Sequence, residues 1–120
     1  MNFKEYQTII KETAIYPSDI GLAYCAMGLT GEAGEVADKI KKLYRDDNLH
    51  TLDAAHEIIL IDTHRYDIAK ELGDVLWYVT AMASEIDMSL EEIMEMNYNK
   101  LIKRRETNTL HGSGDDREIF

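Results

Sequence analysis

Residues 19–44 read DIGLAYCAMGLTGEAGEVADKIKKLY, and this stretch decides the fold. Its apolar residues recur at alternating intervals of four and three, the period of a helix face that packs against other helices. The residues of this seam are Leu22, Ala26, Leu29, Ala33, Val36, Ile40 and Leu43. The spacing therefore predicts one long helix over residues 19–44.

Three further helices follow from the same reasoning, and no strand alternation competes with them. The third helix, residues 66–86, has its own seam of Ile68, Leu72, Val75, Val79, Met82 and Ile86. Residues 2–14 form the first helix, with Asn2 and Glu5 as an N-cap pair, and residues 89–105 form the last, opened by a Ser89–Glu92 capping box. We expect an all-α fold, an antiparallel bundle of about four helices.

The chain length of 120 residues predicts a single domain, 1–120. Residues 45–65 form an insertion between the second and third helices, and residues 107–120 form a C-terminal loop and tail. A domain of this size has little wall for a deep pocket, so we expect a homo-oligomer, either a dimer or a tetramer.

Acidic residues dominate the charge, with 23 Asp and Glu against 13 Lys and Arg and a net charge of −10. This balance argues against a direct nucleic-acid binder, which needs a basic face to replace counterions. The one cysteine, Cys25, excludes an intrachain disulfide and favours a reducing compartment. No apolar run is long enough to span a membrane and no signal peptide is present, so a cytoplasmic location without membrane partners is predicted.

Four acids stand beside the two long seams. Glu32 and Glu35 each directly precede a seam residue of the second helix, and Glu71 and Asp74 do the same on the third. Antiparallel packing of the two helices would bring all four carboxylates to one level, where mutual repulsion raises their pKa values. A hard divalent cation such as Mg²⁺ relieves that repulsion. The alternative, surface acids on amphipathic helices, stays open from the residues alone.

Three glycines interrupt the second helix around the acid pair, Gly28, Gly31 and Gly34. Each costs about 1 kcal/mol relative to alanine in a helix interior. Close approach of another helix or of a ligand to the bare backbone explains them, and a local kink near Leu29 is the alternative.

The last helix supplies cations. Lys100 and Arg104 are four residues apart and can present two positive groups to one phosphate, with Asn97 on the same face. The alternative is a basic helix end favoured by the macrodipole. Acids that hold metal, opposite a cationic pair, are what a polyphosphate substrate requires.

The motifs GEAGEV at residues 31–36 and KELGDVLWY at residues 70–78 resemble the paired acid motifs of the MazG-like, all-α nucleotide pyrophosphohydrolases. The resemblance extends to Asn97-x-x-Lys100-Leu101-x-x-Arg104 and to the tail HGSGDDR at residues 111–117. It covers nearly the whole chain, and small stand-alone members, including phage-encoded ones, begin with a similar Phe3-x-x-Tyr6. A phage member would act in the host cytoplasm.

The resemblance implies hydrolysis of nucleoside triphosphates, often deoxynucleotides, between the α and β phosphates. It implies Mg²⁺, with Mn²⁺ as a substitute, held by Glu32, Glu35, Glu71 and Asp74. Glu32 or Glu35 orients or deprotonates the attacking water, and which of them does so stays open. Lys100 and Arg104 match positions that contact phosphate, Asn97 matches a nearby polar position, and the sites lie at or near subunit contacts.

Two positions depart from the family pattern: Gly31 replaces a frequent acid, and the connection from Glu35 to Glu71 is long. Tyr24, Trp77 and Tyr78 are candidates for stacking on a base, although aromatic residues at helical spacing are more often core.

Two other classes of protein remain as alternatives. A non-catalytic helical scaffold would use its acids only for solubility, and a di-iron bundle would need Glu-x-x-His motifs, which the sequence lacks. Within the enzyme class, dUTP, a modified nucleotide or an alarmone is the alternative substrate.

Overall fold

The computed structural model describes residues 1–46, 53, 57 and 61–112. These residues are largely helical and include no strand. The helices are α1 (Phe3–Thr13), the short 3₁₀ turn η1 (Ser18–Ile20), α2 (Gly21–Asp46), α4 (Asp62–Glu85) and α5 (Leu90–Glu106). The four predicted helices are confirmed, with ends shifted by a few residues. Most of the predicted insertion at residues 45–65, and the end of the predicted tail, lie outside the described residues.

Both predicted helix starts are confirmed by their caps. The Asn2 side chain accepts a hydrogen bond from the backbone N–H of Glu5 at 2.8 Å. The Ser89 hydroxyl accepts from the N–H of Glu92 at 3.0 Å, and the Glu92 carboxylate accepts from the N–H of Ser89 at 3.0 Å. Each cap satisfies backbone donors that the first helical turn leaves without an intrahelical acceptor.

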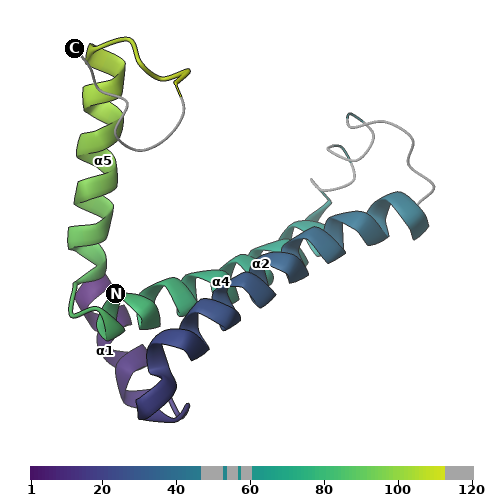
Figure 1. Ribbon diagram of the computed structural model, residues 1–120. Coiled ribbons are helices and arrows are strands. Elements are labelled where there is room, and N and C mark those ends of the chain that lie inside the picture. The colour runs from purple at the N-terminus through teal and green to yellow at the C-terminus, as the bar shows by residue number, and fades with distance from the viewer. Residues whose placement is uncertain (47–52, 54–56, 58–60, 113–120) are drawn as a thin grey trace.

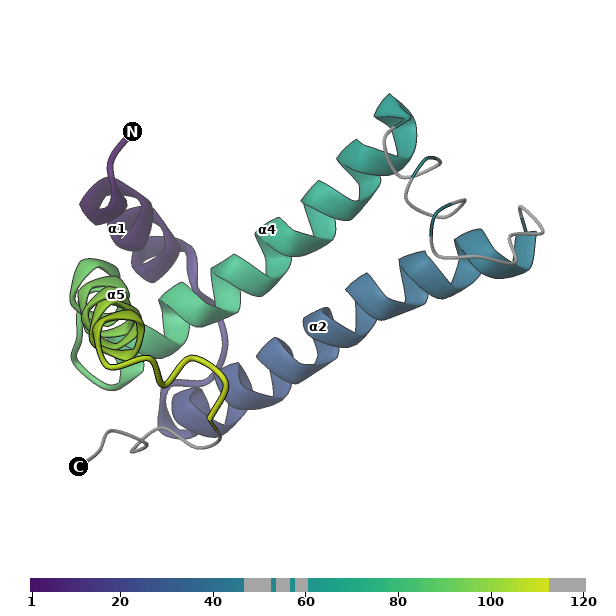
Figure 2. The same cartoon turned by 90° about the horizontal axis from the view of Figure 1, so that it is seen from above.

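The helices of one chain form the predicted bundle only in part. Helices α2 and α4 run antiparallel along each other, α1 packs near the end of α4, and α5 projects away at a steep angle (Figures 1 and 2). The chain therefore has the outline of an L, with the α2–α4 pair as one arm and α5 as the other.

The corner of the L is held by Gln7 of α1. Its Nε2 donates to the Ser84 hydroxyl and to the Met88 carbonyl, both at 3.0 Å, and its Oε1 accepts from the Leu90 N–H at 3.0 Å. Asp87 makes the turn itself in the left-handed region, with φ of 56°. Three hydrogen bonds from one side chain thus tie α1 to the end of α4 and the start of α5.

Helix α2 is unbroken through its glycines, so the kink considered above does not occur. A Cβ on Gly28 would overlap the ring of Tyr78 on α4, which makes Gly28 a point of close helix approach. Around Gly31 and Gly34 the space is open within the chain. The predicted close approach is confirmed at one of the three glycines.

The core of one chain is small, and the predicted seams are only partly covered. Ile10, Cys25 and Ala81 are buried together, whereas the seam residues Leu22 and Leu72 are each 53% exposed. The radius of gyration is 17.8 Å, compared with about 13.6 Å for a compact chain of this length. The accessible surface is 8900 Å², about 2,300 Å² more than the ~6,600 Å² typical of this mass. One chain alone leaves much of its apolar surface in water.

None of the described helices contains a segment both long and apolar enough to cross a membrane.

Candidate functional site

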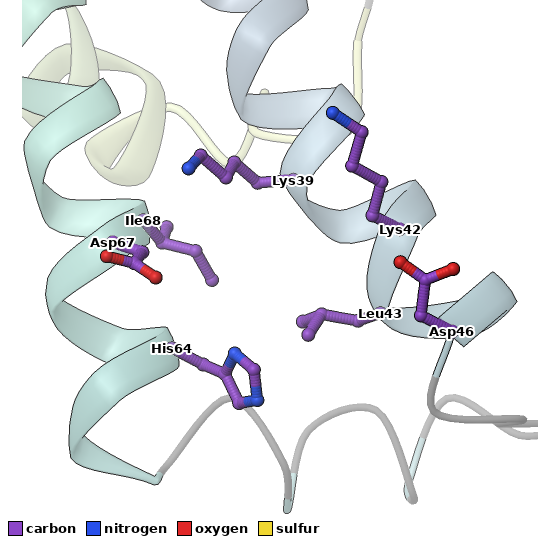
Figure 3. Close-up of a pocket in the computed structure, with 7 residues that line it drawn as sticks. All are labelled: Lys39, Lys42, Leu43, Asp46, His64, Asp67 and Ile68. Carbon is purple, nitrogen blue, oxygen red and sulfur yellow. The ribbon is translucent and has the colours of Figure 1, made fainter.

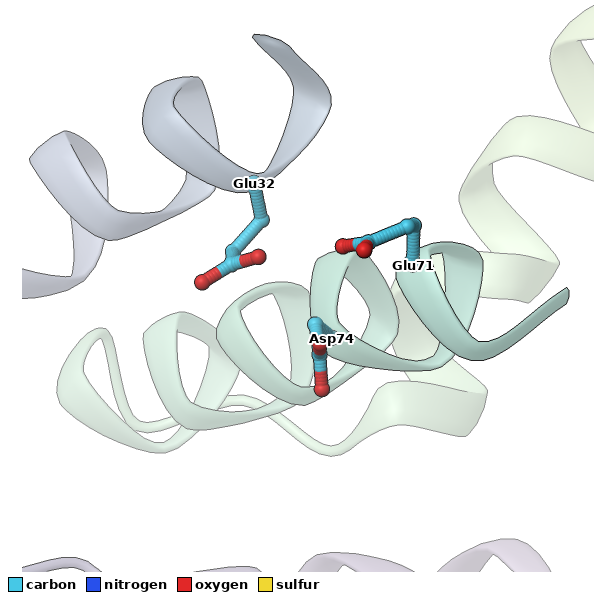
Figure 4. Close-up of side chains that lie close together, drawn as sticks. All are labelled: Glu32, Glu71 and Asp74. Carbon is cyan, nitrogen blue, oxygen red and sulfur yellow. The ribbon is translucent and has the colours of Figure 1, made fainter. Parts of the chain in front are cut away.

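Three of the four predicted acids meet halfway along the α2–α4 pair. Glu32 of α2, and Glu71 and Asp74 of α4, each offer a carboxylate oxygen, and these oxygens all lie within 4.8 Å of one another. Figure 4 shows the Glu32 side chain extending from α2 toward Glu71. The cause is the i, i+3 spacing on α4, which puts Glu71 and Asp74 on the side that faces α2.

The three acids repel one another. The pKa of Glu32 is raised, first by partial burial and then by the charges of Asp74, Glu71 and Glu35. Glu35 itself is exposed and lies outside the close group. The remaining acid therefore acts on the group electrostatically, from one helical turn away.

One cation stands beside the acids. Lys39 Nζ lies 3.8 Å from Glu71 Oε1, and the Lys39 side chain is 41% exposed. An ion pair this open to solvent adds little stability, so it does not bind Glu71 strongly. The sequence analysis missed Lys39, although its position seven residues after Glu32 places it two turns further along the same side of α2.

This donor set fits a hard divalent cation. It consists of carboxylate oxygens on two rigid helices, close enough to share one ion, and partly open to water that can complete the coordination. The raised pKa of Glu32 reports unbalanced negative charge, which a cation would offset.

The aromatic residues predicted to stack on a base pack on one another beside the acids, toward α1. The rings of Trp77 and Tyr78 lie 4.9 Å apart edge to face, and those of Tyr16 and Tyr24 are stacked at 5.1 Å. Burial, followed by neighbouring Tyr24 and Glu32, raises the pKa of Tyr78. Core packing accounts for Trp77 and Tyr78 within the chain, and base stacking stays a prediction.

The predicted phosphate ligands lie on α5. Lys100 and Arg104 fall in the second half of that helix, which leaves the α2–α4 pair at its first turn (Figure 1). Lys100 is ten residues past Leu90, about 15 Å along the helix axis. Arg104 is buried at 6% exposure. One chain therefore does not bring these two cations to its own acids.

Asn97 lies in a different place from both groups. It lines an apolar groove of about 560 Å³ in the inner corner of the L, together with Phe3, Tyr6, Leu76 and Met94.

Comparison with known proteins agrees with the site. The model of the MazG nucleotide pyrophosphohydrolase domain matches residues 23–109, which include all four acids, Lys39, Lys100 and Arg104. The gene 37 protein of Mycobacterium phage L5 is 40% identical over 123 aligned residues, which cover 98% of this chain and all of the phage protein. No solved structure matches the chain.

The family model covers most of the chain and all of the acids that the helices gather. The chain belongs to the MazG nucleotide pyrophosphohydrolases, a metal-dependent family of hydrolases that act on the phosphoric anhydride bonds of nucleotides.

Proposed function

We propose that the protein hydrolyses nucleoside triphosphates, with deoxynucleotides as the main substrates, to a nucleoside monophosphate and pyrophosphate. The observation that carries this proposal is the group of three carboxylates within 4.8 Å on two helices of a MazG-family chain. Glu32, Glu71 and Asp74 would hold Mg²⁺, and Mn²⁺ would substitute for it.

The reaction is a displacement by water at the α-phosphorus. When bound, the divalent cation supplies positive charge that lowers the pKa of a water and neutralises phosphate oxygens. The water oxygen forms a bond to the α-phosphorus, the bond from that phosphorus to the α–β bridging oxygen breaks, and the bridging oxygen leaves with pyrophosphate. The proton of the water passes to a carboxylate of the chain.

We assign that proton to Glu35. It is close enough to raise the pKa of Glu32 but lies outside the group of three, so its oxygens are not needed to hold the cation. Its exposure lets the proton pass on to bulk water. A general base in reach of its water contributes about 100-fold or more to the rate.

A second copy of the chain completes the site in this proposal. The excess of exposed surface over a compact chain, about 2,300 Å², matches what an obligate dimer covers. Lys100 and Arg104 of the second copy would then reach the phosphates beside the acids, which their own chain does not allow. A dimer meets this need, and a tetramer would pair two such dimers.

The test is a panel of canonical dNTPs and NTPs, with dUTP, an oxidised nucleotide and a guanosine alarmone added, each with Mg²⁺ and with a chelator. The expected products are the monophosphate and pyrophosphate, formed only with the metal. Orthophosphate as the first product would contradict cleavage between the α and β phosphates. Full activity in Glu71→Gln would instead support the scaffold alternative with a contaminating enzyme.

A further inference from the structure

The α2–α4 pair has opposite chemistry on the two sides of the acids. Toward α1, the helices are in close contact through Gly28 and Tyr78 and filled by aromatic rings, so no room remains there for an anionic group. Toward the far end of the pair, the helices enclose a pocket of about 210 Å³. Its lining residues are Lys39, Lys42, Leu43, Asp46, His64, Asp67 and Ile68.

The pocket is built for a small anion more than for an apolar group. Figure 3 shows Leu43 and Ile68 facing each other from the two helices, the Lys39 ammonium extending toward α4, and the His64 ring between the helices. Both lining carboxylates have a cation of their own. Asp46 pairs with Arg45 at 2.6 Å, and Asp67 lies 3.8 Å from Lys70. Lys42 shares Asp38 with Lys41.

Lys39 connects this pocket to the acids. Its ammonium lines the pocket and also lies 3.8 Å from a Glu71 oxygen, so a group held by Lys39 is next to a group held at the acids. A metal at the acids would compete with Lys39 for Glu71 and leave the ammonium for another anion. A lysine ammonium is a strong donor to phosphate oxygens.

We propose that this pocket is the subsite for the β- and γ-phosphates of the substrate and for the pyrophosphate product, with Lys39 as its binding residue. The inference rests on the proposed function, and it sets the direction of the substrate. The α-phosphate lies at Glu32, Glu71 and Asp74, the leaving phosphates point to the far end of the α2–α4 pair, and the nucleoside points the other way.

The test compares Lys39→Met with Lys41→Met, a matched control that removes the same charge from the same helix outside the pocket. Calorimetry measures the binding of pyrophosphate, and separately of a nucleoside monophosphate, to the full chain with Mg²⁺. We expect Lys39→Met to weaken pyrophosphate binding at least about tenfold and to leave monophosphate binding within about twofold. Lys41→Met should behave as the wild type, and Lys39→Arg should retain most of the affinity.

Mn²⁺ binding, followed by electron paramagnetic resonance, shows that the acids are intact in Lys39→Met, because it should be unchanged or tighter. Equal pyrophosphate affinity in Lys39→Met and Lys41→Met would overturn the proposal, and so would an equal loss for pyrophosphate and monophosphate. A wild-type chain that binds no pyrophosphate would also overturn it.

The two proposals fail separately. If the wild type hydrolyses triphosphates while Lys39→Met binds pyrophosphate normally, the pocket is wrong and the function stands. If no nucleotide is hydrolysed while Lys39→Met selectively loses pyrophosphate binding, the pocket stands and the function is wrong.

Discussion

Glu32 is the acid on which the charge of the site is concentrated. Its pKa lies above the ordinary 4.5 because of partial burial and three neighbouring carboxylates. The raised pKa means that the folded chain takes up this proton at a higher pH than an isolated glutamate would. A metal ion must displace the proton, so metal affinity should fall as the pH falls through this raised pKa.

Measured by Mn²⁺ titration at a series of pH values, the midpoint of this loss is expected above 4.5, the ordinary pKa of glutamate. Glu35→Gln removes one of the repelling charges and should move the midpoint to lower pH. Glu91→Gln, an exposed acid on α5, serves as the control and should leave it in place. A midpoint unaffected by Glu35 would show that the two carboxylates do not interact.

Metal binding and turnover should separate between two of the acids. Glu71→Gln removes an oxygen of the group of three and should weaken Mn²⁺ binding at least about tenfold, with activity falling in parallel. Glu35→Gln should keep the metal within a few fold while turnover falls about 100-fold. Calorimetry and initial rates measure the two effects, and a loss of metal in Glu35→Gln equal to that in Glu71→Gln would make Glu35 a ligand.

At the level of the helices, Gly28 determines how closely α2 and α4 approach. Gly28→Ala puts a methyl group into the ring of Tyr78, and we expect the free energy of unfolding to fall by about 1–3 kcal/mol. Gly34→Ala meets open space within the chain, and helix propensity should raise stability by up to about 1 kcal/mol. Chemical denaturation of both variants measures the contrast, and a neutral Gly28→Ala would mean that the Tyr78 ring moves aside at no cost.

Gln7 determines the direction in which α5 leaves the other helices. Gln7→Ala removes three hydrogen bonds at the corner and leaves the Leu90 N–H without its side-chain acceptor. The expected loss is about 2 kcal/mol in the free energy of unfolding. Thr8→Ala, the exposed neighbour on α1, should change stability by less than about 0.5 kcal/mol. Similar stability of the two variants would show that packing alone holds the corner.

At the level of the whole molecule, the L shape and its uncovered apolar surface predict self-association. Light scattering should give a mass of two or four chains. Met94→Glu puts a charge on the exposed apolar side of α5 and should shift the protein toward the monomer and reduce activity. Ile15→Glu is the control, since Ile15 is 97% exposed in the loop after α1. A monomeric wild type with full activity would contradict the proposed second copy.

Much of the secondary structure could be predicted because it depends on neighbours in the sequence. The seam of α2 repeats with helical period, Asn2 and Ser89 precede their helices with cap partners three residues on, and each pair of acids has the i, i+3 spacing of one helix side. The MazG motifs added the family, which the comparisons confirmed.

Burial could not be predicted from the same periodicity. Leu22 belongs to the predicted seam of α2, yet the buried residues one position either side of that seam are Gly21 and Cys25. A helix can bury more than one face, and the periodicity of one chain does not say which face meets α4 and which meets another copy. The same gap explains why Lys100 and Arg104 were expected at the acids and lie elsewhere in the chain.

The sequence by itself determined the helices, their caps, the two acid pairs and the family, because each depends on residues within a few positions of one another or on a motif. Only the tertiary structure decided that three acids converge, that Glu35 lies outside them, that Lys39 stands beside Glu71, and that α5 leaves the pair. Those features depend on the rotation of α2 against α4 and on the corner held by Gln7, and contacts between residues far apart in the chain set both.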